Sequence, residues 1–138
     1  MIGFDVRKIS SKDYNDVIRL NESLDCSSIK SITEDGNSMI IVAQLNDEII
    51  GYINFTILND ARYIKNLAIN EIMVKEEYRG LGVGHQLMIE AEKYAADYNA
   101  ASIVAIYNNY KEEEVYFYNK EGFRLNAERR YEKLSYIQ

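Results

Sequence analysis

A glycine-rich loop is the first part of this sequence whose residue types and spacing could do chemistry. Arg79-Gly80-Leu81-Gly82-Val83-Gly84 follows an apolar run that ends at Val74, and a helical pattern begins inside the loop. The N-terminus of a helix carries unpaired backbone N–H groups and about half a positive charge, so it attracts phosphate. The three glycines would let the backbone approach such a ligand closely. The loop therefore predicts a cradle for a phosphate-bearing molecule.

Two common phosphate-binding loops do not fit these residues. A dinucleotide fingerprint, Gly-x-Gly-x-x-Gly, needs glycine where this chain has His85, and a nucleotide P-loop needs Gly-Lys followed by Ser or Thr. The pattern present is Arg79-x-x-Gly82-x-Gly84, preceded by the tract Lys75-Glu76-Glu77-Tyr78. Both nucleotide fingerprints are therefore excluded.

The elements that must position this loop change type along the chain. The upstream part has a helix after the capping residues 10–13 and a polar segment, 21–37, that is predicted as a loop or a short second helix. The rest of the upstream part has strand patterns, of which the last three should form an antiparallel meander. The predicted strands are residues 4–9, 39–45, 49–58 and 63–74.

A helix and a strand follow the loop. Apolar residues recur every three or four positions from Leu81 to Tyr98, which predicts an amphipathic helix, and 102–107 is a short β-rich run. Strand, loop, helix and strand form one unit, in which the crossover should be right-handed and the two strands parallel. Such a unit places the helix N-terminus beside the strand ends.

The C-terminal part is predicted to hold one more helix and two closing strands. Asn109 and Glu112 stand at capping-box spacing, so a helix should start there, and Gly122 is a suitable C-terminal cap. Segments 123–125 and 131–136 are expected to pair with each other.

Two segments of the chain resemble a known family. Val115-Tyr116-Phe117-Tyr118-Asn119-Lys120-Glu121-Gly122-Phe123 resembles the Phe-Tyr-x-Lys-x-Gly-Phe stretch of the GCN5-related N-acetyltransferase (GNAT) superfamily, and the glycine loop resembles the signature of that family. The resemblance is close over about residues 69–125. It implies an α/β fold of the GNAT type, with a mixed central sheet of six to seven strands and about four flanking helices. The sheet should have an antiparallel N-terminal meander and one parallel strand pair that is splayed at the cofactor.

The resemblance also implies acetyl-coenzyme A (acetyl-CoA) as cosubstrate. Backbone N–H groups of the loop would hold the pyrophosphate, and the pantetheine arm would pair like an extra strand with the end of the preceding strand. The cofactor-binding residues expected on this basis are Ile72, Met73, Val74, Arg79, Gly80, Leu81, Gly82, Val83, Gly84, His85, Asn109, Lys111 and Tyr118.

Two of these cofactor residues have open roles. His85 could approach the phosphates, cap the helix or simply be exposed. Lys111 stands where the family often has an asparagine that contacts the cofactor, and Asn109 is displaced from that position. Lys111 could instead face a phosphate.

The transfer step would depend on Tyr118 and Glu71. Tyr118 matches the family tyrosine that protonates the departing thiolate, a role that suits a phenol with a pKa of about 10; the alternative is that it only packs in the core. Glu71 is the candidate general base, because an ammonium must lose a proton before it attacks; the alternative is a carboxylate that only orients the amine. Cys26 is not expected as a nucleophile, because no base is adjacent in sequence and the family mechanism is direct transfer.

Composition narrows the classes of protein and partner. The chain has 138 residues, 47% of them hydrophobic, which fits one globular domain over residues 1–138. A net charge of -6 argues against nucleic acid and anionic membranes as partners. One cysteine and one histidine cannot form a Cys/His zinc cluster, so no metal is expected. The sequence lacks an apolar run of ~18 residues and a signal-peptide pattern, which predicts a cytoplasmic protein.

The resulting functional hypothesis is an N-acetyltransferase that passes an acetyl group from acetyl-CoA to a primary amine of a small molecule or peptide by direct attack. The acid-rich composition suggests a cationic acceptor. One alternative is a non-catalytic coenzyme A-binding sensor or interaction module, and another is a protein-binding α/β domain with a chance glycine turn. Relatives often form homodimers, and an exposed edge strand at 131–136 could pair across a two-fold axis.

Overall fold

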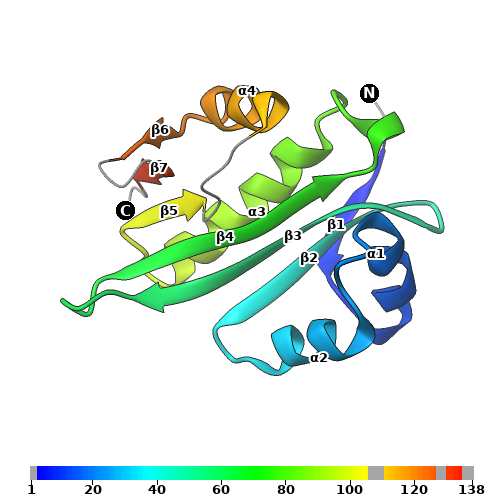
Figure 1. The fold of residues 1–138 in the computed structure, drawn as a ribbon, viewed down its shortest axis with the longest axis horizontal. Helices are drawn as coiled ribbons and strands as arrows, with labels where there is room; N and C mark the ends of the chain where they lie inside the picture. Colours follow the sequence, from blue (N-terminus) through cyan, green and yellow to red (C-terminus); the bar gives the residue numbers. More distant parts are fainter. Residues whose placement is uncertain (1–2, 106–110, 127–129, 135–138) are drawn as a thin grey trace.

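A seven-stranded mixed sheet forms the centre of the structure, a computed structural model that describes residues 3–105, 111–126 and 130–134 (Figure 1). The strand order is β1-β2-β3-β4-β5-β7-β6, and β4 and β5 form its parallel pair. The strands are β1 (Asp5–Lys8), β2 (Ser38–Leu45), β3 (Glu48–Asn59), β4 (Lys65–Val74), β5 (Ser102–Ala105), β6 (Arg124–Leu125) and β7 (Tyr131–Leu134). The predicted α/β architecture, with an antiparallel meander followed by a parallel pair, is confirmed.

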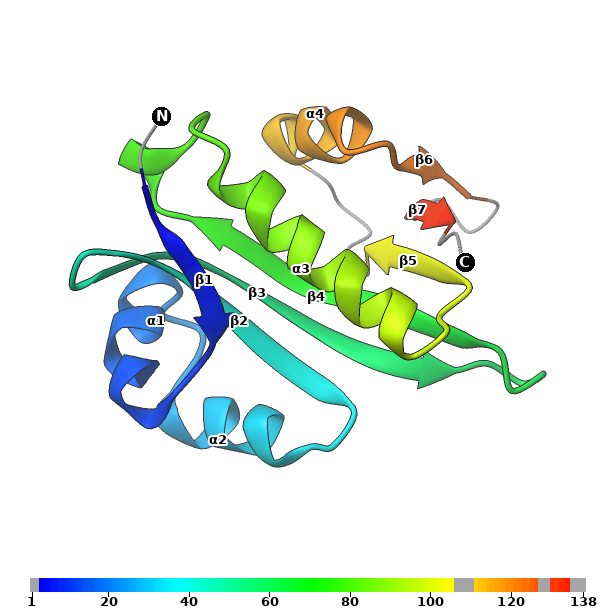
Figure 2. The same ribbon diagram turned by 180° about the vertical axis from the view of Figure 1, so that it is seen from behind.

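Helices cover both faces of the sheet. Figures 1 and 2 show α1 and α2 on one face and α3 on the other. A fourth helix, α4, lies beside the N-terminal half of α3, where Gly84 and Phe117 meet. In the described part of the chain the α-helices are α1 (Tyr14–Leu20), α2 (Cys26–Glu34), α3 (Val83–Asp97) and α4 (Glu112–Lys120), and short 3-10 turns span Ser11–Asp13 and Glu76–Tyr78.

Alternation along the central strands builds a separate core on each face. On β3, Ile53 and Phe55 point toward α3 and belong to the larger core, which also contains Leu87. Tyr52 points the other way, into a smaller core with Val17 of α1 and other apolar side chains. This period-two pattern is what the apolar, β-branched sequence of the meander predicts.

The polar segment 21–37 contains a helix, so the second of the two predicted alternatives is correct. Asp25 caps α2 by accepting a hydrogen bond from the backbone N–H of Ser28 at 2.7 Å. Ile29 and other apolar residues of α2 pack into the smaller core. The weak periodicity of the segment reflects a helix of nine residues with a single buried side chain.

The parallel ladder between β4 and β5 is short. It pairs Asn66–Ile69 of β4 with Ser102–Ala105 of β5. Residues 70–74 of β4 have no β5 partner in the described part of the chain. The predicted end of the strand at 107, and the predicted splay beyond the ladder, fall on 106–110, which lie outside the described residues.

The C-terminal region corrects two predictions. α4 begins at Glu112 with Lys111 as its N-cap, so the helix starts later than the predicted Asn109, a residue outside the described ranges. β7 pairs with β5 on one side and β6 on the other, so 131–134 is an inner strand of the sheet and not the predicted edge. The predicted pairing of 123–125 with the last strand is confirmed over Arg124–Leu125.

Across the described residues, every helix is too short or too polar to cross a bilayer.

Candidate functional site

The glycine loop joins β4 to α3 and leaves a row of backbone donors open. Gly80 and Gly82 adopt left-handed backbone angles, with φ of 78° and 89°, and Gly82 is the N-cap of α3. The first helical hydrogen bond runs from the N–H of Gln86 to the carbonyl of Gly82 at 3.0 Å. Among the described residues, no acceptor pairs with the N–H groups of residues 80–85. These donors, at the positive end of a helix of fifteen residues, can hold an anion.

Gly84, the third glycine, has a packing role that the sequence did not predict. A Cβ on Gly84 would lie 2.9 Å from Cε1 of Phe117, so Gly84 allows α4 to pack closely against α3. Gly80 and Gly82 have open space around them, and they are needed for their positive φ. Gly84 is therefore required for helix packing, and the close approach of a ligand to the backbone of the three glycines stays a prediction.

Arg79 connects three elements around the loop. Its Nε donates to the carbonyl of Val74 at the end of β4 at 2.9 Å. Its Nη1 lies 3.5 Å from Oε2 of Glu113 in the first turn of α4. A shallow hollow lined by Lys111, Glu112, Glu113 and Tyr116 adjoins this ion pair. The guanidinium therefore places positive charge between the strand end, the loop and α4.

The end of β4 is the strand segment beside the loop. Ile72, Met73 and Val74 are half-buried and pair with β3 along one edge. Ile72 and Val74 pack on the α3 face, whereas Met73 packs on the opposite face. The other edge of this segment has no strand partner in the described ranges, which suits an extended ligand that pairs with backbone groups.

Tyr118 lies inside an aromatic cluster under α4. Its side chain is only 3% exposed. The ring stacks on Tyr131 at a centroid distance of 5.6 Å and packs edge-on against Phe123 at 5.1 Å and Phe117 at 5.5 Å. The structure therefore holds the phenol in one orientation, and core packing and a chemical role are compatible.

Glu71 is held by two residues that the sequence did not point to. Asn21 donates from Nδ2 to Oε2 of Glu71 at 2.6 Å, and the hydroxyl of Tyr52 donates to Oε1. Asn21 also donates to the Tyr52 hydroxyl at 3.2 Å, so the three side chains form a closed triangle. Glu71 lies on the opposite face of β4 from Ile72.

The two partners of Glu71 come from distant parts of the chain. Asn21 follows α1 and Tyr52 lies on β3, 50 and 19 residues from Glu71 respectively. The sequence offers one weak signal for Tyr52, because a tyrosine in a largely buried strand has a hydroxyl that needs a hydrogen-bond partner. No comparable signal marked Asn21, which lies in a polar turn.

The other residues that the sequence singled out lie in different surroundings. His85 is 57% exposed, and its Nδ1 lies 3.0 Å from both carboxylate oxygens of Glu121, the C-cap residue of α4. Lys111 is exposed, and its backbone N–H donates to Oε1 of Glu114 at 3.2 Å. Asn109 is outside the described residues. Cys26 is exposed at the start of α2, away from the loop in sequence and on the other face of the sheet from α3.

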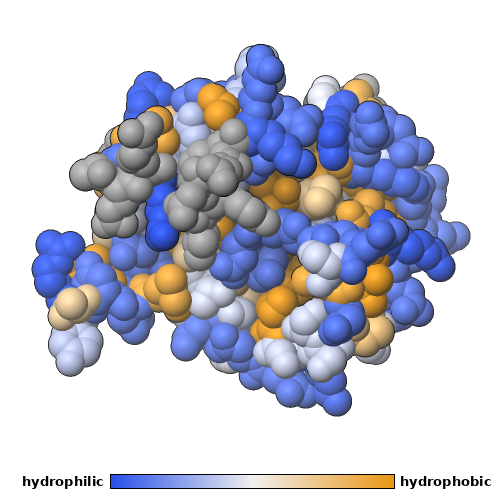
Figure 3. All heavy atoms as spheres, in the orientation of Figure 1, coloured by the Kyte–Doolittle hydropathy of each residue, from blue (hydrophilic) through white to orange (hydrophobic). Residues whose placement is uncertain are grey.

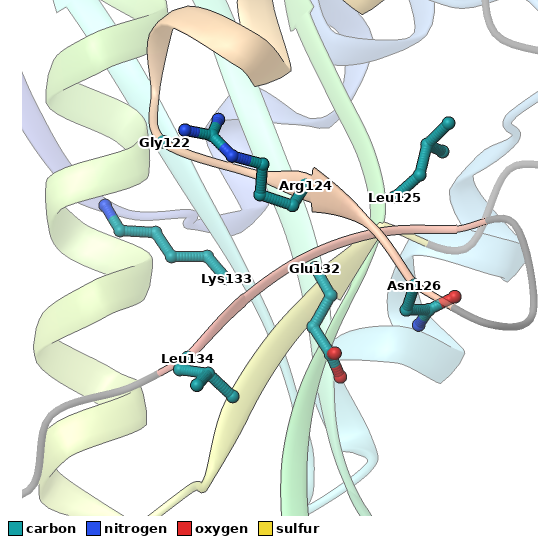
Figure 4. A pocket seen from close by; sticks show the side chains of 7 residues that line it. All are labelled: Gly122, Arg124, Leu125, Asn126, Glu132, Lys133 and Leu134. Carbon is teal, nitrogen blue, oxygen red and sulfur yellow. The ribbon is translucent and has the colours of Figure 1, made fainter.

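Other features of the surface do not compete with this site. Within the described ranges, no group of three His, Cys, Asp or Glu side chains could hold a metal ion. Figure 4 shows another hollow, formed by β6, β7 and the preceding Gly122, and none of its lining residues belongs to the predicted cofactor set. Lys133 at its rim is already paired with Glu92 at 3.0 Å.

Comparisons with solved structures agree with this architecture. The fold is similar to that of a transcriptional regulator from Bacillus halodurans C-125, with 21% identity, a TM-score of 0.79, and coverage of 88% of this chain and 93% of that chain. It is similar to an acetyltransferase from Trypanosoma brucei, with 18% identity, a TM-score of 0.76, and coverage of 90% and 94%. PaiA N-acetyltransferase from Thermoplasma acidophilum, solved in complex with coenzyme A, shares 17% identity at a TM-score of 0.75, with coverage of 96% and 99%.

The family comparison covers most of the sequence. No curated protein matches the chain. A family model described as "Acetyltransferase (GNAT) family" matches residues 5–123, which include the meander, the glycine loop, α3 and α4. The chain therefore belongs to the GNAT acetyltransferase family.

Proposed function

We propose that this protein transfers an acetyl group from acetyl-CoA to a primary amine of a small molecule or peptide. The observation that carries the proposal is the row of N–H groups at residues 80–85 that no described residue pairs, beside the edge of β4 that lacks a strand partner in the described ranges. Membership of the GNAT family supports acyl transfer in general. The coenzyme A complex of the PaiA relative supports coenzyme A as the acyl carrier.

The loop and β4 would divide the binding of acetyl-CoA between them. The amides of residues 80–85 and the N-terminus of α3 would neutralise the pyrophosphate. The open edge of residues 72–74 would hold the pantetheine arm by backbone hydrogen bonds, as an added strand does. Acetyl-CoA would supply the activated acetyl carbon, and the loop and β4 would hold that carbon in position.

Tyr118 and Glu71 would handle the protons of the transfer. The amine nitrogen bonds to the acetyl carbon as the carbon–sulfur bond breaks, and the bond electrons leave on sulfur. Tyr118 would donate its phenolic proton to that thiolate, and a proton lost by the amine restores the phenol. Glu71 would accept the proton that converts the acceptor from ammonium to free amine, directly or through water. The net products are an amide, a free thiol and one proton.

A non-catalytic coenzyme A-binding module is the alternative. It would use the same loop, so cofactor binding alone does not separate the two. A sensor module would release no free thiol from acetyl-CoA with any amine. Tyr118 and Glu71, placed on α4 and β4, favour the enzyme.

The loop itself is tested by Gly82→Val. A β-branched residue is strongly disfavoured at a φ of 89°, so the loop should lose its open N–H groups. Acetyl-CoA at about 100 times its Kd should stabilise the wild-type protein by about 2.7 kcal/mol, a rise in Tm of several degrees, and this rise should vanish in Gly82→Val.

Gly36→Val is the matched control for this experiment. Gly36 has a negative φ and no atom near its Cβ position, so the variant should keep the full ligand-induced shift. An unchanged shift in Gly82→Val would remove the loop from cofactor binding. Absence of any shift in the wild type would refute the proposal.

A further inference from the structure

An extra residue in β4 brings two neighbouring side chains to the same face of the sheet. Asn54 of β3 pairs with Glu71, but the next residue, Phe55, pairs with Ile69, so Asn70 is the additional residue of a β-bulge. A bulge of this kind re-aims side chains that would otherwise alternate. Asn70 and Glu71 therefore lie side by side on the face that carries α1 and α2.

Hydrogen bonds confirm the direction of both side chains. Asn70 donates from Nδ2 to Oγ1 of Thr56 at 2.9 Å and approaches Oδ1 of Asn54 at 3.5 Å. Thr56 and Asn54 are on the same face of β3 as Tyr52, the partner of Glu71. The bulge thus places an amide and a carboxylate on one polar patch.

Among the described residues, the side chains that form this patch offer unoccupied hydrogen-bond acceptors and carry no positive charge. Nδ2 of Asn70 is engaged, but its Oδ1 accepts no hydrogen bond from the described residues. Every fully buried side-chain oxygen in the described part has a partner, so this half-buried residue's Oδ1 is open to solvent. Glu71 has about four lone-pair sites, of which Asn21 and Tyr52 occupy two.

The chemistry of the patch selects a cation with several donors. A primary ammonium carries three N–H donors and no acceptor, which matches one amide oxygen and two carboxylate oxygens. The side chains bonded to Asn70 and Glu71 are uncharged, so the negative charge of Glu71 is not neutralised by them. An anionic acceptor would be repelled by the Glu71 carboxylate.

The patch lies on the face shown in Figure 1, and Asn70 and Glu71 are each only partly buried. α1 packs on β3 and α2 on β2, and neither helix lies over β4 in that view. Figure 3 shows the same face, on which hydrophilic residues predominate. The turn that contains Asn21 borders the patch on the α1 side.

We infer that Asn70 and Glu71 together bind the primary ammonium of a cationic aliphatic acceptor, and that Tyr52 and Asn21 are positioning residues that hold the Glu71 carboxylate. This inference rests on the proposed acetyl transfer and names the acceptor class. It assigns Asn70, which a regular strand would turn away, to acceptor binding. Glu71 then receives a proton from an ammonium that is already its ligand.

Two substitutions at Asn70 should move acceptor affinity in opposite directions. With acetyl-CoA as donor and cadaverine, a lysine peptide and aniline as acceptors, the wild type should prefer the two cationic amines. Loss of one hydrogen bond to a charged group in Asn70→Leu should raise the KM of these amines about tenfold. Asn70→Asp adds negative charge and should lower the same KM about threefold, a gain that misfolding cannot produce. The KM of acetyl-CoA should stay within about twofold in both.

Further variants test the positioning residues and the control. Tyr52→Phe and Glu71→Gln should each raise the amine KM at least about threefold without changing the KM of acetyl-CoA, and Glu71→Gln should also lower kcat. Asn15→Asp makes the same charge change on the exposed side of α1 and should change neither KM. An amine KM that is unchanged in Asn70→Leu and Asn70→Asp would overturn the inference, as would an equal change in the KM of acetyl-CoA.

Binding without turnover separates this inference from the proposed function. Titration calorimetry of cadaverine into the protein with coenzyme A should show binding that Asn70→Leu weakens about tenfold. A wild type that binds cadaverine but transfers nothing would refute acetyl transfer and leave the ammonium site standing. A wild type that transfers acetyl only to aniline, or that binds no cationic amine, would refute the ammonium site.

Discussion

Tyr118 owes its position to an aromatic cluster formed by α4, the residues that follow it and β7. Phe123 packs against its edge, and Tyr131 of β7 stacks on its face at an interplanar angle of 16°. A buried phenol on a helix next to the glycine loop can donate a proton without competition from bulk water. The sequence motif identified Tyr118, whereas its stacking against the ring of Tyr131 could not be predicted from the sequence.

Substitution of this hydroxyl should separate binding from turnover. In Tyr118→Phe the ring stacking remains, so affinity for acetyl-CoA should change little, while kcat should fall at least about tenfold because the thiolate loses its proton donor. The matched control is Tyr116→Phe on the exposed side of the same helix, where the side chain is 69% exposed and kcat should be unchanged. Equal kcat in Tyr118→Phe and wild type would remove Tyr118 from the mechanism.

Other residues of the site could not be read from the sequence. Asn21 and Tyr52 reach Glu71 only because the sheet and α1 fold together. Asn70 shares a face with Glu71 only because of the bulge, which shifts the register by one residue. A hint was present, since asparagine is unfavourable inside a strand, but strand alternation alone assigns Asn70 to the wrong face.

At the scale of elements, close packing of α3 and α4 sets the geometry around the loop. Phe117 leaves no room for a Cβ on Gly84, so Gly84→Ala must push α4 outward or shift the ring. Overpacking of this kind should lower the free energy of unfolding by about 1–3 kcal/mol. Urea denaturation of the ligand-free protein measures this loss, and Gly84→Ala combined with Phe117→Leu should recover part of it.

Gly36→Ala serves as the control for the packing prediction. Gly36 has a negative φ and open space where the added methyl group would lie, so its stability change should stay within about 1 kcal/mol. Equal effects at the two glycines, or no recovery in the double variant, would contradict a packing role for Gly84.

Most elements follow from periodicity and capping signals. The meander, α3 and α4 were predicted because apolar spacing and turn residues agree along those stretches. The position of β7 between β5 and β6 was not predicted. Strand order depends on tertiary pairing, and strands of only four and two residues carry no local signal for it. The N-cap of α4 was predicted at Asn109 because Glu112 follows it by three residues. Glu114 follows Lys111, the N-cap in the structure, at the same spacing, so the spacing alone could not decide between them.

At the scale of the whole molecule, an ion pair between the partly exposed Arg7 and the buried Asp13 connects the N-terminal strand to its neighbours. Arg7 on β1 binds both carboxylate oxygens of Asp13, at 2.7 and 2.9 Å, and Gln44 of β2 accepts from the same guanidinium. Burial of Asp13 acts to raise the pKa of its carboxyl, but hydrogen bonds from Arg7 and Ser10 outweigh this and hold the pKa below its ordinary value of 3.8. The ionised carboxylate therefore stabilises the fold.

The lowered pKa of Asp13 fixes the sign of the pH dependence. Its stabilisation is complete above 3.8 and is lost as the pH falls through the lower pKa of the folded state. Asp13→Asn should reduce the free energy of unfolding by about 1–3 kcal/mol at neutral pH, and the difference from wild type should shrink on acidification. Urea denaturation across this pH range measures it. Asp16→Asn, which removes the exposed pair with Arg19, should have little effect, and a pH-independent deficit in Asp13→Asn would contradict the account.

The net charge of -6 and the proposed ammonium-binding site at Asn70 and Glu71 both favour a cationic acceptor, the first at long range and the second on contact. The overall charge would attract cationic amines over a Debye length, and the patch would select them on contact. Localisation in the cytoplasm, a single domain over 1–138 and a homodimer remain predictions from the sequence. With β7 inside the sheet, pairing of two copies through edge strands would have to use β1 or β6.

The central claim, acetyl transfer from acetyl-CoA to an amine, is tested most directly by release of free thiol from acetyl-CoA in the presence of cadaverine or a lysine peptide. The wild-type protein should release thiol at a rate that saturates with both substrates, and mass spectrometry should find one acetyl group on the amine for each thiol released. Thiol release that does not depend on any amine, or no release beyond that without protein, would contradict the claim.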